Sequence, residues 1–146
     1  MKAFRFNLAA ALRLREREEQ TQTQALGLAQ GRLASARRDL DSWRDRHHQS
    51  EQDFAQARRA PLPAEAVHQY RHHADFLRRR LTFAEQTRAL AQEEVAQRRE
   101  TWQQARRARQ VLERLRDQHY ARWQTECRRV EDRELEEAAR RRSQAL

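Results

Sequence analysis

Apolar residues recur every seven positions along this chain, in two columns separated by one short proline-containing segment. The first column consists of Leu12, Glu19, Leu26, Leu33, Leu40, His47 and Phe54, and two of these seven places are polar. The second column runs through Tyr70, Leu77, Ala84, Ala91, Ala105 and Leu112. A seven-residue repeat is typical of helices that pack lengthwise against each other. The chain is therefore predicted to be an all-α, antiparallel two-helix coiled-coil hairpin with a longer second helix.

The two prolines set the expected boundaries of the helices. Pro61 and Pro63 disfavour helical backbone at the residues before them, so a turn is predicted at about 60–63. Helix one is expected over about 7–59, with Asn7 as a plausible N-cap, and helix two over about 64–144. With 146 residues and two glycines, the chain is expected to form a single coiled-coil domain over 1–146.

Folding the chain back at about residue 62 makes a specific set of facing residues. Large side chains then face small ones, or apolar side chains face each other, at most layers, as dense packing requires. The expected pairs include Phe54 with Tyr70, Leu40 with Ala84, Leu33 with Ala91, Ala29 with Val95, and Leu12 with Leu112. Glu19 is expected within reach of Arg109. Residues beyond about Tyr120 are expected to lack a partner within the chain.

The charge of the chain is high, but it is mixed. Charged residues make up 36% and the net charge is +9, so burial should be confined to one narrow seam and an acidic partner is favoured. Arginines alternate with Glu and Asp along the whole length, which is typical of a solvated helix surface.

No pattern of residues indicates a catalytic, cofactor or metal site. His68 and His72 share a helical face, but the glutamate of a zinc-hydrolase motif is absent. Cys127 has no His or Asp at a readable spacing, and as the one cysteine it fits a reducing cytoplasm. The apolar run Phe6–Leu12 is too short for a signal peptide or a membrane span. A cytoplasmic, non-enzymatic protein without cofactors is expected.

Several short motifs resemble the FliJ family of flagellar export proteins. The motifs are Phe4-Arg5-Phe6-Asn7-Leu8, Leu12-Arg13-Leu14-Arg15-Glu16 with Glu19, then Leu26, Leu33, Leu40 and Trp43, then Tyr70, Leu77 and Leu81 after the break, then Leu112-Glu113-Arg114-Leu115-Arg116 and Tyr120, and finally Arg133-Glu134-Leu135-Glu136-Glu137-Ala138-Ala139. Together they cover essentially the whole chain. The resemblance implies a coiled coil similar to the central stalk of rotary ATPases.

The resemblance also implies partners and contact residues. Family members bind a hexameric export ATPase and the cytoplasmic domain of the export gate, and they recycle export chaperones. The implied ATPase contacts at the terminal end are Leu8, Leu12, Leu112, Leu115, Tyr120 and Trp123. The implied gate contacts near the turn are Leu40, Trp43, Tyr70 and Leu77. The chain departs from the family pattern at two aromatic positions further along helix one, which are polar here, around Arg46, His47, Ser50 and Glu51. His73 also stands where an aromatic residue is common in the family. The implied location is the cytoplasmic face of the inner membrane at the flagellar base.

Other functions fit the same pattern of residues. The equivalent stalk of a virulence-type injectisome shares the shape and the charge. A basic coiled coil that binds nucleic acid would bind less tightly as salt rises and would cluster its arginines on one face. The interleaved acidic residues argue against that second alternative.

Overall fold

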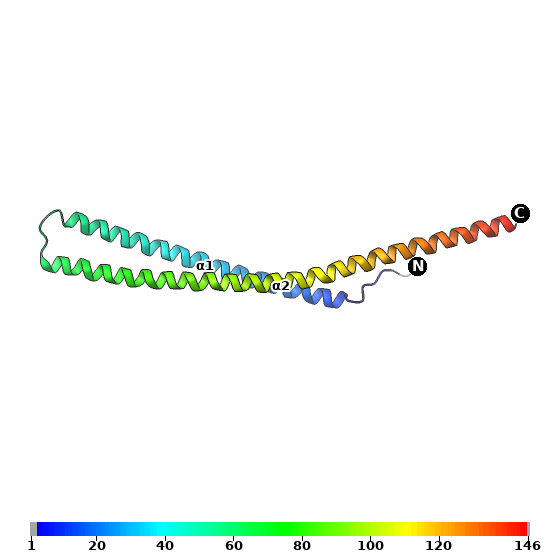
Figure 1. Ribbon diagram of the computed structural model, residues 1–146, viewed down its shortest axis with the longest axis horizontal. Coiled ribbons are helices and arrows are strands. Elements are labelled where there is room, and N and C mark those ends of the chain that lie inside the picture. The colour runs from blue at the N-terminus through cyan, green and yellow to red at the C-terminus, as the bar shows by residue number, and fades with distance from the viewer. Residues whose placement is uncertain (1–2, 146) are drawn as a thin grey trace. The chain divides into compact units, whose positions relative to one another are not determined.

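Two long α-helices make up the fold, joined by one short connection (Figure 1). The computed structural model describes residues 3–145. Helix α1 covers Ala9–Ala57 and helix α2 covers Ala64–Gln144, and no strand occurs within residues 3–145. The predicted all-α hairpin with a longer second helix is confirmed. Neither helix has, in its described part, an apolar stretch able to cross a membrane.

The helices contribute to two compact units. The turn unit comprises residues 22–102, and the terminal unit comprises the described residues 3–21 and 103–145. In each unit, a part of α1 packs against a part of α2 along a line of contact that we call the seam.

The seam of the turn unit has the predicted large-on-small packing. Ala29, Leu33 and Val95 are buried together, and Leu26 and Ala91 pack against them. The predicted pairing of Phe54 with Tyr70 is also confirmed, because their ring centroids lie 5.1 Å apart. Small residues let the two backbones approach closely while leucine and valine fill the space between them. The spacing of apolar residues therefore fixes the register of the hairpin.

The prolines act as expected in the connection between the helices. Residues 58–63 lie outside both helices, and the Pro63 carbonyl accepts a hydrogen bond from the Val67 backbone N–H at 3.2 Å. Pro63 thus stands at the start of α2, where its missing N–H costs nothing. Glu65 lies in the first turn, where a negative charge favours the positive end of the helix dipole.

A polar layer interrupts the seam of the terminal unit. The Arg109 guanidinium binds Glu19 across the seam, as predicted, and also binds Glu113 one turn further along α2. The hydrogen bond to Glu19 raises the pKa of Arg109 above its ordinary value, and Glu113 adds to the effect against partial burial. While the two glutamates are ionised, a raised arginine pKa means that this contribution to stability is present below the ordinary pKa of arginine and is lost as the pH rises above it. Arg109 therefore stays positively charged throughout the physiological pH range.

The segment before α1 lies along α2. Residues 3–6 are not helical, and Phe4 packs on Tyr120 and Trp123, with ring centroids 5.1 and 5.9 Å apart. Phe6 contacts His119 in the same way. The expectation that residues beyond Tyr120 lack a partner in the chain was therefore wrong for Trp123. The physical reason is that extended residues reach further per residue than helical ones, so this short segment covers an additional part of α2.

Beyond this contact, the last part of α2 is exposed to solvent. Residues 128–145 are all exposed, and in Figure 1 no other described segment of the terminal unit lies beside the last part of the helix. This last part of α2, residues 128–144, carries a mainly acidic stretch at 131–137, followed by three consecutive arginines at 140–142.

Two glycines within α1 provide a test of its stability. Gly27 and Gly31 have helical backbones, and a Cβ built on either would meet nothing within 4 Å. We expect Gly27→Ala and Gly31→Ala each to stabilise the hairpin by about 1 kcal/mol, because alanine restricts the unfolded chain and costs no packing. Urea unfolding followed by circular dichroism measures the change. A loss of stability in either variant would contradict the open surroundings of these positions.

Candidate functional site

The four residues expected to contact the gate all lie in the turn unit, where Trp43, Tyr70 and Leu77 line one groove, but the four differ in exposure. Leu40 and Leu77 are buried in the seam, with 3% and 2% of their surface exposed. Trp43 and Tyr70 are half-buried. A partner can therefore reach Trp43 and Tyr70, whereas Leu40 and Leu77 hold the two helices beneath them.

Trp43 belongs to a cluster of rings and guanidinium groups. Its ring and the ring of Phe76 form a T-shaped pair, with centroids 6.3 Å apart. The guanidinium carbons of Arg46 and Arg80 lie 4.6 and 5.6 Å from the centroid of Trp43, and Arg80 lies 5.5 Å from the centroid of Phe76. Such cation–π contacts hold the rings in place at the surface. Phe76, which the sequence analysis did not single out, could have been found from its place directly before the seam residue Leu77.

Two grooves flank the seam near the turn, and they differ in chemistry. The groove on the Trp43 side has a volume of about 460 Å³ and is lined by rings and a few charged groups, among them Arg46, His73 and Phe76. The groove on the other side, of about 570 Å³, is lined mainly by charged side chains, including Arg58, Arg71 and Arg78 with Glu51 and Asp75. Small or polar seam residues, such as Ser50, leave this space between the helices. We call the ring-lined side the turn surface: it consists of Trp43, Arg46, His73, Phe76 and Arg80.

The residues expected to contact the ATPase lie in the terminal unit. Leu12 is buried, Leu112 and Leu115 are half-buried, and Leu8 and Tyr120 are exposed. Tyr120 stacks on Trp123, with ring centroids 5.6 Å apart. We call the accessible members the terminal surface: it consists of Leu8, Leu112, Leu115, Tyr120 and Trp123.

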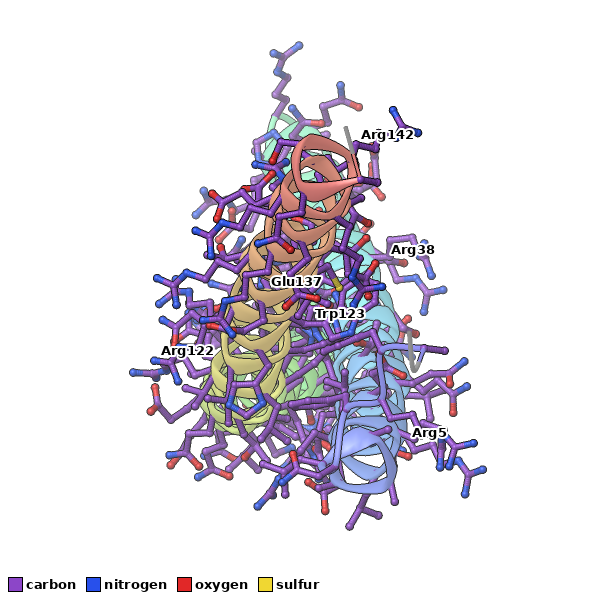
Figure 2. All side chains as sticks on the ribbon, turned by 90° about the vertical axis from the view of Figure 1, so that its right-hand side faces the viewer. Arg5, Arg38, Arg122, Trp123, Glu137 and Arg142 are labelled. Atoms are coloured by element: carbon purple, nitrogen blue, oxygen red, sulfur yellow. The ribbon has the colours of Figure 1, made fainter. Side chains whose placement is uncertain are left out.

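Phe4 is part of the same aromatic group, because it packs on both rings of the terminal surface. In Figure 2, Trp123 is labelled on the side of α2 toward the N-terminal segment, whereas the neighbouring Arg122 points outward on another side. From the sequence, Phe4 stands out only as part of a motif, because a heptad pattern does not place non-helical residues.

The chemistry of both surfaces is that of protein contacts. No group of three or more His, Cys, Asp and Glu side chains within residues 3–145 is arranged to hold a metal ion. Cys127 is a half-buried free cysteine. Large rings beside arginines are the residue types enriched where proteins bind one another.

Comparison with known proteins identifies one family. The family model described as "FliJ: Flagellar FliJ protein" matches residues 4–145 of the chain. No curated protein and no solved structure matches it.

Proposed function

Because this chain belongs to the FliJ family of flagellar proteins, we propose that it is a non-enzymatic stalk and adaptor of the flagellar type III export apparatus. The observation that carries the proposal is the family match over residues 4–145 of an antiparallel two-helix hairpin. The family is one of structural and adaptor proteins that act in flagellar export. The specific partners, and a position at the cytoplasmic face of the membrane at the flagellar base, are part of the proposal.

The terminal surface is the proposed contact with the hexameric export ATPase. Leu8 and Tyr120 expose apolar area there, and Trp123 stacks on Tyr120. Aromatic anchors of this kind contribute a large share of the binding energy in protein interfaces. The net charge of +9 favours an acidic partner surface, such as an acidic ring lumen, and should speed association with it.

The turn surface is the proposed contact with the export gate. The family's contact face lies near the turn, and here it carries the Trp43–Phe76 ring pair with Arg46 and Arg80 over the rings. The family resemblance implies an aromatic residue where this chain has His73, so we expect the rings of Trp43 and Phe76, with the arginines over them, to provide most of the contact. Export chaperones are proposed as a third class of partner.

A pull-down with the purified export ATPase tests the ring assignment. We expect the full-length chain to retain the ATPase, to promote its hexamerisation and to raise its turnover. A chain that neither binds the ATPase nor changes its assembly and turnover would rule out the stalk role. The same experiment with the cytoplasmic domain of the gate tests the second contact independently.

A further inference from the structure

Three large apolar side chains of α2 are exposed at equal intervals in the turn unit. Phe76, Phe83 and Leu90 are each seven residues apart, and 39%, 64% and 68% of their surface is exposed. A single exposed apolar residue is ordinary on a protein surface. A repeat of seven is different, because it is the spacing at which one helix presents a stripe to another helix. We call these three residues the α2 stripe.

The stripe lies on one side of the seam. Each of its residues directly precedes a seam residue of the second column, so the three share one face of α2. Glu94 follows Leu90 by four residues and therefore lies on the same face. It reaches Arg32 of α1 at 2.7 Å. The ring-lined groove beside Phe76 opens on this side as well. The stripe is thus a second apolar line on α2 beside the seam line, and at its Phe76 end it also touches Trp43 of α1.

The blocks of charge on the two sides of Phe83 have opposite net sign. Residues 71–80 carry four arginines, two histidines and one aspartate, whereas residues 85–94 carry three glutamates and one arginine. The positions that flank the stripe follow the same division. His72, His73, Arg79 and Arg80 flank it near Phe76, and Glu93 and Glu94 flank it near Leu90. One end of the segment is therefore basic and the other is acidic. The spacing of the apolar residues is symmetric, because Phe76 and Leu90 each lie seven residues from Phe83.

We propose that the α2 stripe binds a second copy of this chain, with the two α2 segments antiparallel and Phe83 at the two-fold axis. Phe76 then faces Leu90 of the second copy, and the basic block of each copy lies along the acidic block of the other. A closed two-fold interface requires such self-complementarity. A parallel arrangement would place the two basic blocks together, and their repulsion would oppose it. Three large side chains per copy make a small interface, so we expect self-association in roughly the micromolar range.

Sedimentation velocity of the full-length chain over a range of concentrations tests the proposal without any export partner. We expect Phe83→Lys to weaken self-association by at least about tenfold, because it places two ammonium groups at the axis. Ala89→Lys is the matched control, since it adds the same charge at an exposed α2 residue outside the stripe, and it should leave the association unchanged. A wild-type chain that stays monomeric up to roughly 100 µM would overturn the proposal, as would equal losses in both variants.

Cysteine crosslinking tests the direction of the pairing. In a Cys127→Ser background, Phe83→Cys should crosslink to itself across the axis. A mixture of Phe76→Cys and Leu90→Cys chains should crosslink with each other in preference to themselves. Preferential crosslinking of position 76 to position 76 would show a parallel contact and would overturn the antiparallel assignment.

Discussion

Leu77→Asp should unfold much of the turn unit. Leu77 has 2% of its surface exposed, so the substitution removes a buried apolar side chain and leaves a carboxylate between two helices. Burial of an unpaired charge is among the few single changes that cost several kcal/mol, and we expect a loss of about 4 kcal/mol in the free energy of unfolding. Because the two helices bury apolar residues only along a narrow seam, no larger core compensates for the lost packing. Denaturant unfolding monitored by circular dichroism should show a midpoint far below that of the wild type.

Leu135→Asp is the matched control for this prediction. It makes the same substitution in the same helix, at a residue with 69% of its surface exposed. Its free energy of unfolding should stay within about 0.5 kcal/mol of the wild type. Similar losses in the two variants would mean that the seam residue is no more important than a solvated one, which would contradict the packing of the hairpin.

Substitutions at the two proposed surfaces should separate the two partners. Tyr120→Ala combined with Leu8→Ala removes exposed apolar area from the terminal surface, and we expect at least a tenfold loss of affinity for the export ATPase, about 1.4 kcal/mol, with gate binding retained. Trp43→Ala removes the central ring of the turn surface. For this variant we expect a loss of affinity for the gate, with ATPase binding retained. Both variants should reduce swarming motility and export. Titration calorimetry with each partner measures the separation.

A third variant checks that the losses are specific. Leu28→Ala removes a leucine with 65% of its surface exposed that belongs to neither surface, so both affinities should match the wild type. Circular dichroism must show that every variant remains helical at the temperature of the measurement. If Trp43→Ala weakened binding of the ATPase as much as binding of the gate, the assignment of one partner to each unit would be wrong.

The gate and ATPase residues inferred from the family resemblance differ in how directly they can act. Leu40, Leu77 and Leu12 belong to the seven-residue columns and are buried by the seam, so their effect on a partner would pass through the stability of the hairpin. Trp43, Tyr120 and Trp123 present ring surface. Sequence spacing cannot make this distinction in full, because a residue on a seam column is buried only to the extent that its neighbour on the other helix covers it.

The seven-residue repeat and the two prolines were enough to determine the class of fold, the approximate ends of the helices and pairs such as Ala29 with Val95. They suffice because a helix places every seventh residue on nearly the same face, and because proline ends a helix locally. The tertiary structure alone decided where Phe4 packs, which rings Arg46 and Arg80 cover, and that Phe76, Phe83 and Leu90 remain exposed on one side. The first two features depend on a non-helical segment and on side-chain rotamers, which no repeat along the chain encodes. The third depends on how far the other helix covers a face whose seven-residue spacing is visible in the sequence, whereas its exposure is not.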